Sequence, residues 1–549
     1  MVTGSKPWLE HARPRGWAWV LVALLAAPTL AAEPEPEPET LALTLQRGDT
    51  LIGVGERYLQ DPRRWPELQR LNRIGNTRRL VPGASLQIPL AWLRWSELPV
   101  EVVHVTGQVT GNRRLLALGM RLRPGDSFDT GQGTLTLRFD DGALAVFAPQ
   151  TRAALGQSRE TPIGGVRDTR IDLNQGAVET TVTPLSTPSS RFDVKTPRVV
   201  TAVRGTRFRV AQEEQVSRHE VLEGRVSTLG AGQTAVDIAA GSGLRAEDGQ
   251  LGAVVRLLPA PDLAALPRTI ERTSALLQLP PLAGASAWRW QVALDARFAQ
   301  LLQDARTREP TWLLTGLPDG DYHLRVRGAD AQSLEGSDAQ MVFALRARPE
   351  APLKLSPPNG ASVTAGTPLA WAQLPGAPTY HLQLARDAAF ADTVFDQAGL
   401  SGNRKTFDPP LAPGVYHWRI ATQRPDGSRG PFGDPASFTV LEPSSVAPPQ
   451  LGAAGLQLAW SGPAGFSHQV QVSLSPDFAQ PEFDQVVAGT SLTLPDPKPG
   501  SYHVRTRVIL PDASAGPWSE PQHFEVSPPP APPPSRPWYL LLILLLPLL

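Results

Sequence analysis

Hydrophobic and polar residues alternate with a period of two through much of the chain. Between residues 100 and 255 the alternation is clear at Leu135, Leu137 and Phe139, which precede a hairpin-type turn at Asp140–Gly142. Successive side chains of a strand point to opposite faces, so this pattern predicts half-buried β-strands. The 47 glycines and 57 prolines are spread between such segments, where they favour turns. A chain of 549 residues is too long to fold around a single hydrophobic core, so we expect a multidomain, mainly β protein.

Residues 44–90 follow helical spacing over part of their length. Two groups of apolar residues, separated by Asp61-Pro62, recur at intervals of three and four: Leu51, Val54 and Tyr58, then Trp65, Leu68 and Leu71. A short strand beginning at Thr44 and the alternating pair Leu86 and Ile88 flank them. Thr50 is placed to cap the first helix. The segment is therefore predicted to be a small βααβ module.

This βααβ segment resembles the LysM family along its whole length. The matching elements are Gly48-Asp49-Thr50-Leu51, Trp65-Pro66, Leu71-Asn72, Pro82-Gly83 and Leu86-Gln87-Ile88-Pro89. The resemblance implies binding of N-acetylglucosamine-containing polymers, chiefly peptidoglycan, in a shallow groove between loops 48–51 and 72–76. The candidate contact residues in these loops are Gly48, Asp49, Thr50, Leu51, Asn72 and Ile74. A structural interpretation is compatible with this one: Asp49 and Thr50 cap the first helix, and Asn72 ends the second.

The chemistry of these loops suits a sugar. Backbone groups in tight turns and the amide of Asn72 can hydrogen-bond acetamides and hydroxyls, while Leu51 and Ile74 offer an apolar floor. Nine arginines against four acidic residues between Arg47 and Arg94 favour a solvated basic surface. Attraction to anionic wall polymers is the alternative.

Residues 98–256 resemble the FecR periplasmic domain. Four elements agree in the family's order: Leu122-Arg123-Pro124-Gly125-Asp126, the Asp141-Gly142 hairpin, Arg204-Gly205-Thr206-Arg207-Phe208 and Glu223-Gly224-Arg225-Val226. FecR is a signal-relaying regulator of ferric citrate uptake, and its cytoplasmic segment controls a sigma factor. Only sixteen residues precede the apolar run of this chain, too few for that segment. We therefore expect this chain to share only the β-rich interaction domain with FecR, and not its cytoplasmic segment.

Three repeats of about 90 residues follow, at 275–348, 350–441 and 446–527. Their equivalent elements are Gly320-Asp321-Tyr322-His323, Gly414-Val415-Tyr416-His417 and Gly500-Ser501-Tyr502-His503, each preceded by a phenylalanine (Phe298, Phe390, Phe478) and, seven residues before it, a glutamine (Gln291, Gln383, Gln471). This period is too long for a solenoid and predicts tandem β-sandwiches. The units resemble fibronectin type III domains, with an early-strand tryptophan at Trp371 and Trp460 that the first repeat lacks.

The two ends of the chain predict export. Basic residues and the apolar run Trp17–Leu30 indicate a secretory signal peptide over 1–32, with an uncleaved anchor as the alternative. An acidic, proline-rich linker follows at 33–43. At the other end a proline-rich spacer, 528–537, precedes a leucine-rich tail, 538–549, that is too short to span a bilayer. We interpret this tail as a half-span or interfacial anchor, against the alternative of a frayed apolar end.

Charge and composition exclude several classes of function. Basic and acidic residues balance at 52 each, which argues against nucleic acid as a partner. The absence of cysteine excludes thiolate metal sites and cysteine nucleophiles. Asp140 and Asp141 fit a turn better than a catalytic pair, and Arg204–Thr206 fits close backbone approach better than phosphate binding. The repeated histidines, His323, His417 and His503, fit exposed strand positions better than metal ligation.

The sequence thus predicts a non-catalytic envelope protein with no cofactor and no metal. Its expected partners are peptidoglycan and an unidentified envelope protein, with membrane contact through the tail. The favoured hypothesis is a scaffold that holds the wall and presents β-rich interaction domains. The alternatives are an envelope signal-relay protein related to FecR regulators and a cell-wall hydrolase accessory factor.

Overall fold

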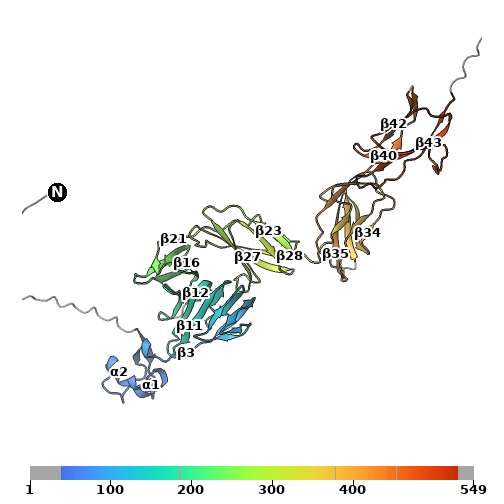
Figure 1. Cartoon of the computed structure of the whole chain (residues 1–549). Coiled ribbons are helices and arrows are strands. Elements are labelled where there is room, and N and C mark those ends of the chain that lie inside the picture. Colours follow the sequence, from blue (N-terminus) through green and yellow to red (C-terminus); the bar gives the residue numbers. More distant parts are fainter. Residues whose placement is uncertain (1–38, 185–186, 377–378, 453, 529–549) are drawn as a thin grey trace, which may run out of the picture. The chain divides into compact units, whose positions relative to one another are not determined.

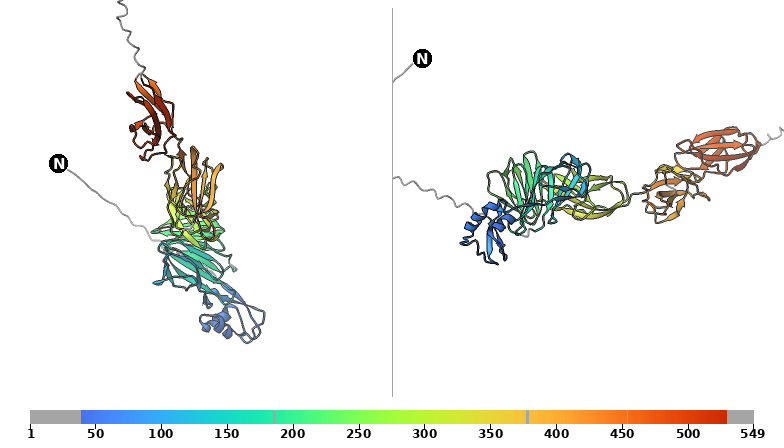
Figure 2. Two further views of the ribbon diagram at one scale, coloured as in Figure 1. Left: turned by 90° about the vertical axis from the view of Figure 1, so that its right-hand side faces the viewer. Right: turned by 90° about the horizontal axis from the view of Figure 1, so that it is seen from below.

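The computed structural model describes residues 39–184, 187–376, 379–452 and 454–528. Strands dominate these residues, and both α-helices among them lie before residue 72 (Figures 1 and 2). The multidomain, mainly β fold class is thereby confirmed. By packing, residues 39–99, 157–170 and 187–192 form one compact unit, and the other described residues form a second.

The predicted leader, most of the acidic linker, nearly all of the proline-rich spacer and the apolar tail lie outside the described residues. Within the described ranges, no helix combines the length and apolar character needed to cross a bilayer.

The first unit has the predicted βααβ order: β1 (Thr40–Thr44), α1 (Leu51–Tyr58), η1 (Pro62–Arg64), α2 (Trp65–Leu71), β2 (Ser85–Pro89), η2 (Leu90–Trp92) and β3 (Ser96–Glu97). Helix α1 begins at Leu51 because Thr50 is extended and its Oγ1 accepts a hydrogen bond from the Gly53 amide at 3.0 Å. Strand β1 pairs antiparallel with β2, Thr40 lying opposite Pro89. The strand therefore begins before residue 44, where the sequence placed the start of the module.

The core of the first unit draws on residues outside 44–90. Leu93, Ile163 and Val166 are at most 7% exposed and pack with the buried leucines of the two helices. Ile163 and Val166 lie in a hairpin turn that Thr161 holds, since its Oγ1 accepts from the Val166 amide at 3.0 Å and donates to the Ile163 carbonyl at 2.7 Å. The 44–90 segment alone thus lacks part of the core that this fold uses.

Residues 100–256 carry the FecR-like domain, whose antiparallel strands join in a closed barrel. Its strands are β4 (Val100–Thr106), β5 (Thr110–Gly111), β6 (Arg114–Leu115), β7 (Arg121–Leu122), β8 (Ser127–Asp129), β9 (Thr134–Arg138), β10 (Leu144–Phe147), β11 (Arg152–Glu160), β12 (Arg167–Thr181), β13 (Arg191–Lys195), β14 (Val200–Val203), β15 (Arg207–Glu213), β16 (Val216–Glu223), β17 (Arg225–Leu229), β18 (Val236–Ala239), β19 (Ser242–Glu247), β20 (Gln250–Leu251) and β21 (Val255–Arg256).

Two of the turn interpretations in this domain are confirmed. Gly142 has φ +84° between β9 and β10, and the Ala143 amide donates to Asp141 Oδ1 at 3.0 Å, so the carboxylate holds the turn. Gly205 has φ +74°, and a Cβ added there would lie 2.7 Å from Pro184 Cα. Arg204–Thr206 is therefore a point of close backbone approach.

The three repeats fold as two-sheet units. The first contains β22 (Thr269–Ile270), β23 (Ser274–Gln278), β24 (Ala287–Ala293), β25 (Leu301–Thr307), β26 (Thr311–Thr315), β27 (Gly320–Ala329) and β28 (Ala339–Leu345). The second contains β29 (Lys354–Ser356), β30 (Ala361–Val363), β31 (Leu369–Trp371), β32 (Thr379–Ala385), β33 (Thr393–Leu400), β34 (Arg404–Lys405), β35 (Gly414–Gln423) and β36 (Ala436–Val440). The third contains β37 (Ser445–Val446), β38 (Gln450–Gly452), β39 (Gly455–Ser461), β40 (Ser467–Ser473), β41 (Phe483–Ala488), β42 (Ser491–Leu494), β43 (Gly500–Ile509) and β44 (Gln522–Val526).

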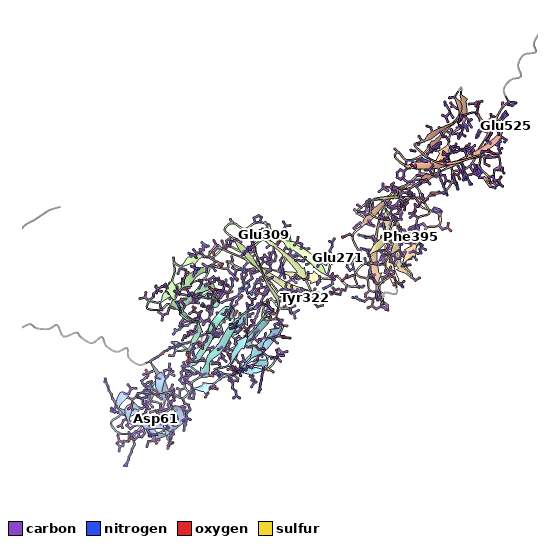
Figure 3. All side chains as sticks on the ribbon, viewed as in Figure 1. Asp61, Glu271, Glu309, Tyr322, Phe395 and Glu525 are labelled. Atoms are coloured by element: carbon purple, nitrogen blue, oxygen red, sulfur yellow. The ribbon has the colours of Figure 1, made fainter. Side chains whose placement is uncertain are left out.

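A tyrosine occupies the same place in each repeat. The hydroxyl of each donates to the carbonyl four residues upstream: Tyr322 to Pro318 at 2.8 Å, Tyr416 to Ala412 at 2.8 Å and Tyr502 to Lys498 at 3.0 Å (Tyr322 is labelled in Figure 3). The tyrosine rings pack on phenylalanines of the last strands. The core of the first repeat also includes Leu266 and Ile270, upstream of the predicted start at 275.

Candidate functional site

The residues expected to contact a glycan are engaged in holding the first unit together. Asn72 Nδ2 donates to the carbonyls of Leu68 at 2.9 Å and Gln87 at 2.8 Å, and its Oδ1 accepts from the Gln87 amide at 2.6 Å. This amide therefore ties the end of α2 to β2, and its hydrogen-bonding groups are already used.

The residues of loop 48–51 are also engaged in holding the fold. Asp49 accepts a hydrogen bond from the Gln46 amide at 2.7 Å, Thr50 caps α1, and Gly48 has φ +95°. Leu51 is 1% exposed, so its side chain belongs to the core and does not form an apolar floor. Ile74 is half-buried against the same core. Sugar binding by these loops stays a prediction, and their backbone groups are candidates to make it.

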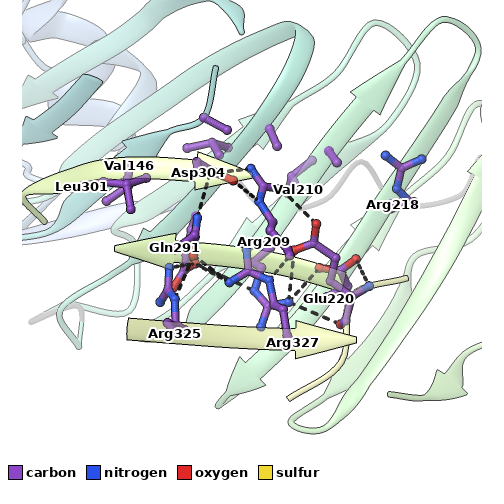
Figure 4. Close-up of a pocket in the computed structure, with 17 residues that line it drawn as sticks. Val146, Arg209, Val210, Arg218, Glu220, Gln291, Leu301, Asp304, Arg325 and Arg327 are labelled. Atoms are coloured by element: carbon purple, nitrogen blue, oxygen red, sulfur yellow. Dashed lines mark hydrogen bonds and ion pairs between the residues drawn. The ribbon is translucent and has the colours of Figure 1, made fainter. Parts of the chain in front are cut away.

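A second candidate site lies where the FecR-like domain meets the first repeat. Five arginines and five carboxylates, all with side chains at most 20% exposed, form one network: Arg207, Arg209, Arg289, Arg325, Arg327, Glu179, Glu220, Asp304, Glu335 and Asp338. We call this set the charge joint. Figure 4 shows the side chains of Arg209 and Glu220 facing those of Arg325 and Arg327. Each arginine of the set pairs with at least one of the acidic residues.

Glu179 on β12 and Arg325 on β27 form the central pair of the charge joint. Both guanidinium Nη atoms donate to the carboxylate, Nη1 to Oε1 and Nη2 to Oε2, each at 2.8 Å. The Arg325 Nε donates to Gln291 Oε1 at 2.9 Å, and its guanidinium stacks on Phe298 with the ring centroid at 4.3 Å. A bidentate pair fixes orientation as well as distance, so it holds β12 and β27 in one alignment.

Further pairs surround this centre. Asp338 accepts from Arg207 at 2.5 Å, from Arg209 at 3.1 Å and from Arg327 at 3.2 Å. Glu335 accepts from Arg289 at 2.9 Å and also pairs with Arg327. Two acidic residues of the first repeat thus neutralise arginines from both sides of the contact.

The arginines determine the ionisation of most of these acids. Burial alone would raise the pKa of Glu179, but Arg325 and Arg207 hold it below its ordinary value. The pKa values of Glu335 and Asp338 are lowered for the same reason: burial raises them, and the surrounding arginines outweigh it. These carboxylates are therefore charged at neutral pH, and the joint is ionic.

Glu220 on β16 is the exception. Burial raises its pKa to about 7 and the charge of Glu335 adds to the rise, while Arg209, 3.4 Å away, offsets only part of it. Its Oε1 accepts from the Glu335 amide at 2.8 Å. The pKa of the adjacent His219 shifts in the opposite direction, because burial and then the charge of Arg218 lower it to about 3. This part of the joint therefore carries a proton near neutrality, on the acid and not on the imidazole.

The space inside the charge joint is a cavity of about 30 Å³ lined by Glu179, Arg209, Gln291 and Arg325 among others. Such a volume suits water, whereas ligand pockets have ~300 Å³ or more. Apolar contact adds to the ionic pairs, because Val146 of the FecR-like domain packs against Phe298 and Leu301. The arrangement is that of an interface between two β domains.

The sequence contained a signal for this joint that periodicity did not use. Two pairs of arginines are spaced by two residues on strands: Arg207 with Arg209, and Arg325 with Arg327. This spacing places both arginines of a pair on one face of the sheet. Pairing of basic faces with acids on another domain depends on contacts far apart in sequence, and no local pattern encodes them.

The remaining chemical candidates do not assemble into a site. Within the described ranges, no group of three or more histidine, cysteine or acidic side chains is arranged to hold a metal ion. His503 packs beside Phe478 and His523, with ring centroids 6.5 and 5.1 Å away.

Part of the chain matches a known protein family. The family described as FecR protein matches residues 126–227, which include the joint residues Glu179, Arg207, Arg209 and Glu220. No LysM or fibronectin family matches. None of the curated proteins matches the chain.

Several solved structures are similar to parts of the chain. Two putative anti-sigma factors from Parabacteroides distasonis show 14% and 12% identity and TM-scores of 0.20 and 0.19, over 24% and 30% of this chain and 58% and 59% of theirs. The FN1–FN3 domains of chicken CNTN1 show 13% identity and a TM-score of 0.19, over 47% of this chain and 96% of that one. The chain thus spans less than two thirds of the two anti-sigma-factor structures.

Proposed function

We propose that this chain is a non-catalytic, exported protein of the bacterial cell envelope that relays a signal through its FecR-like domain. The FecR family match over residues 126–227 supports a regulatory role over a purely structural one. The observation that carries the proposal is the charge joint, because it fixes the FecR-like domain to the first repeat through buried, oriented ion pairs.

The joint has the physical properties that a relay needs. A bidentate pair such as Glu179 with Arg325 tolerates little rotation, so a displacement of β12 moves β27 with it. Removing one partner of a buried ion pair costs ~3–5 kcal/mol, which makes an altered alignment a distinct state. Binding of an envelope partner at either domain would then change the alignment of the other.

Transcript profiling in the native host tests the proposal. A strain carrying Glu179→Gln should change the same transcripts as deletion of the gene, with the protein present at its normal level. The control is Glu247→Gln, an exposed acid of the same domain that pairs with Arg245 on the surface. Unchanged transcripts in the deletion strain would contradict a relay.

Holding of peptidoglycan by the first unit is a second candidate function. The βααβ order of β1, α1, α2 and β2 favours it. Gly48, Asp49, Thr50, Leu51, Asn72 and Ile74 would then shape the glycan-binding loops, with backbone groups making the polar contacts. Retention at the wall would keep the FecR-like domain in the envelope.

A further inference from the structure

All three repeats carry the same polar array on the sheet face that points away from the core. An aspartate accepts from a glutamine amide, the glutamine oxygen accepts from an arginine Nε, and the guanidinium stacks on a phenylalanine with positive φ. The members are Asp304, Gln291, Arg325 and Phe298 in the first repeat, Asp396, Gln383, Arg419 and Phe390 in the second, and Asp484, Gln471, Arg505 and Phe478 in the third.

The geometry of the array is closely repeated. The three glutamine-to-aspartate hydrogen bonds are each 2.8 Å long. The hydrogen bonds from arginine Nε to glutamine are 2.9, 2.7 and 2.9 Å in chain order. The centroid of the phenylalanine ring lies 4.3, 4.1 and 4.1 Å from the guanidinium carbon. Each arginine is therefore held along its Nε edge and on one face, with its remaining terminal nitrogens turned outward; in the third repeat Arg505 Nη2 also donates to Gln471 at 2.7 Å.

In the first repeat those outward nitrogens bind Glu179 of the FecR-like domain. In the second, Arg419 Nη1 and Nη2 have no acceptor among the described residues, and Asp396 and Glu271 act on Arg419 only through their charge. In the third, Arg505 Nη1 and both Nη atoms of Arg507 likewise lack an acceptor among the described residues. The position filled in one repeat is open in the other two.

The surroundings of this position differ between repeats at equivalent places. Isolated bridges pair Ala329 with Glu335, Gln423 with Arg429 and Ile509 with Ala515, which sets the alignment of the three segments. Counting on from these bridges, Asp338 of the first repeat corresponds to Phe432 and Trp518. These rings cover the second face of the guanidinium, at 4.5 Å for Arg419 and 4.4 Å for Arg505. The first repeat is acidic there and receives arginines, whereas the others are aromatic and basic.

We propose that the faces around Arg419 in the second repeat and around Arg505 and Arg507 in the third dock a protein partner whose exposed strand presents a carboxylate. The first repeat supplies the precedent, because β12 presents Glu179 to Arg325 in this way. Two aromatic walls leave only the guanidinium edge accessible, and that edge matches a carboxylate with two parallel hydrogen bonds. The inference does not depend on the proposed relay.

The regular spacing of side chains along the sheet face favours a strand over an anionic glycan as the partner. Arg419 and Arg505 stand on β35 and β43, whose alternate residues Trp418 and Val504 are buried in the core. The strand of the partner would therefore contact side chains that are regularly spaced along one face, as β12 contacts β27. No acidic residue stands where Asp338 does in the first repeat, so the partner's strand should carry few arginines.

A designed hairpin peptide tests the proposal on the full-length protein. One strand of the peptide has the sequence of Gly176–Thr181, which contains Glu179, and the other strand is uncharged. Binding is followed by the indole NMR signal of Trp518, with the signal of the buried Trp371 as a reference for intact folding. We expect a saturable shift of the Trp518 signal with no shift of the Trp371 signal, and at least ~tenfold weaker binding of a Glu179→Gln peptide.

Variants of the protein separate the guanidinium fork from simple charge. Arg505→Lys together with Arg507→Lys keeps the charge but loses the bidentate fork, so affinity at Trp518 should fall ~tenfold. Arg404→Lys, on β34 in the other sheet of the second repeat, is the matched control and should bind as the wild type does. Equal binding of the two peptides, no saturable shift up to millimolar peptide, or arginine-dependent binding of oligogalacturonate in place of the peptide would each overturn the proposal.

Discussion

Glu220 and His219 are neighbours on β16 with pKa values that move in opposite directions. Between pH 4.5 and 7 the folded chain keeps a proton on Glu220 that the unfolded chain releases, so this contribution to stability falls as pH rises. Between pH 3 and 6.5 the unfolded chain holds a proton on His219 that the folded chain lacks, so this contribution rises with pH. The two slopes cancel between pH 4.5 and 6.5.

Single substitutions should expose each slope. In Glu220→Gln, stability should rise between pH 5 and 6.5 by up to ~1.4 kcal/mol per pH unit, because only the His219 contribution remains. In His219→Gln it should fall by a similar amount. Hydrogen exchange of β16 amides, corrected for the intrinsic pH dependence, measures both. Slopes of the same sign in the two variants would contradict this assignment.

Gly205 is required for backbone approach as well as for its conformation. Gly205→Ala places a Cβ 2.7 Å from Pro184 Cα at φ +74°, so it should cost more than the ~1 kcal/mol expected from conformation alone. Gly232→Ala is the matched control, since Gly232 has φ +67° with nothing within 4 Å of the added Cβ. Thermal unfolding should show a clearly larger loss for Gly205→Ala. Equal losses would show that the contact with Pro184 is unimportant.

At the scale of elements, the hairpin turn around Ile163 completes the core of the first unit. Ile163 is 7% exposed, so Ile163→Ala should destabilise this unit by ~2–4 kcal/mol. Hydrogen exchange of α1 amides measures the effect. Ile52→Ala on α1 itself removes an apolar side chain that is 51% exposed, and it should change exchange little. If the two variants behave alike, the turn does not contribute to this core.

The sequence predicted most elements and missed the contacts between distant ones. Strand alternation and helical spacing identified the βααβ order and the two-sheet repeats because those signals are local. The participation of Ile163 in the first core and the pairing of Glu179 with Arg325 depend on residues distant in the sequence, 146 positions apart for the ion pair, and local periodicity carries no such information. The candidate glycan residues were found by resemblance, yet Asn72 and Leu51 proved to serve the fold itself.

At the scale of the whole molecule, wall binding is tested on the full chain. The protein should sediment with insoluble peptidoglycan, and Asn72→Ala should reduce retention, because loss of its hydrogen bonds at ~1 kcal/mol or more each loosens loop 72–76. Circular dichroism checks that the variant is folded. Binding through loop backbone should persist from low to moderate salt. Release at modest salt would instead attribute retention to the basic surface between Arg47 and Arg94.

The central claim is that the FecR-like domain and the first repeat act as one unit through the charge joint. Hydrogen exchange measured by mass spectrometry on full-length Glu179→Gln tests it most directly, with Glu247→Gln as control. We predict that peptides from β15 and β16 lose protection together with peptides from β27 and β28, by similar free energies, while β43 keeps its protection. Loss of protection confined to the FecR-like strands would contradict the claim, because the substitution would then have weakened its own domain alone.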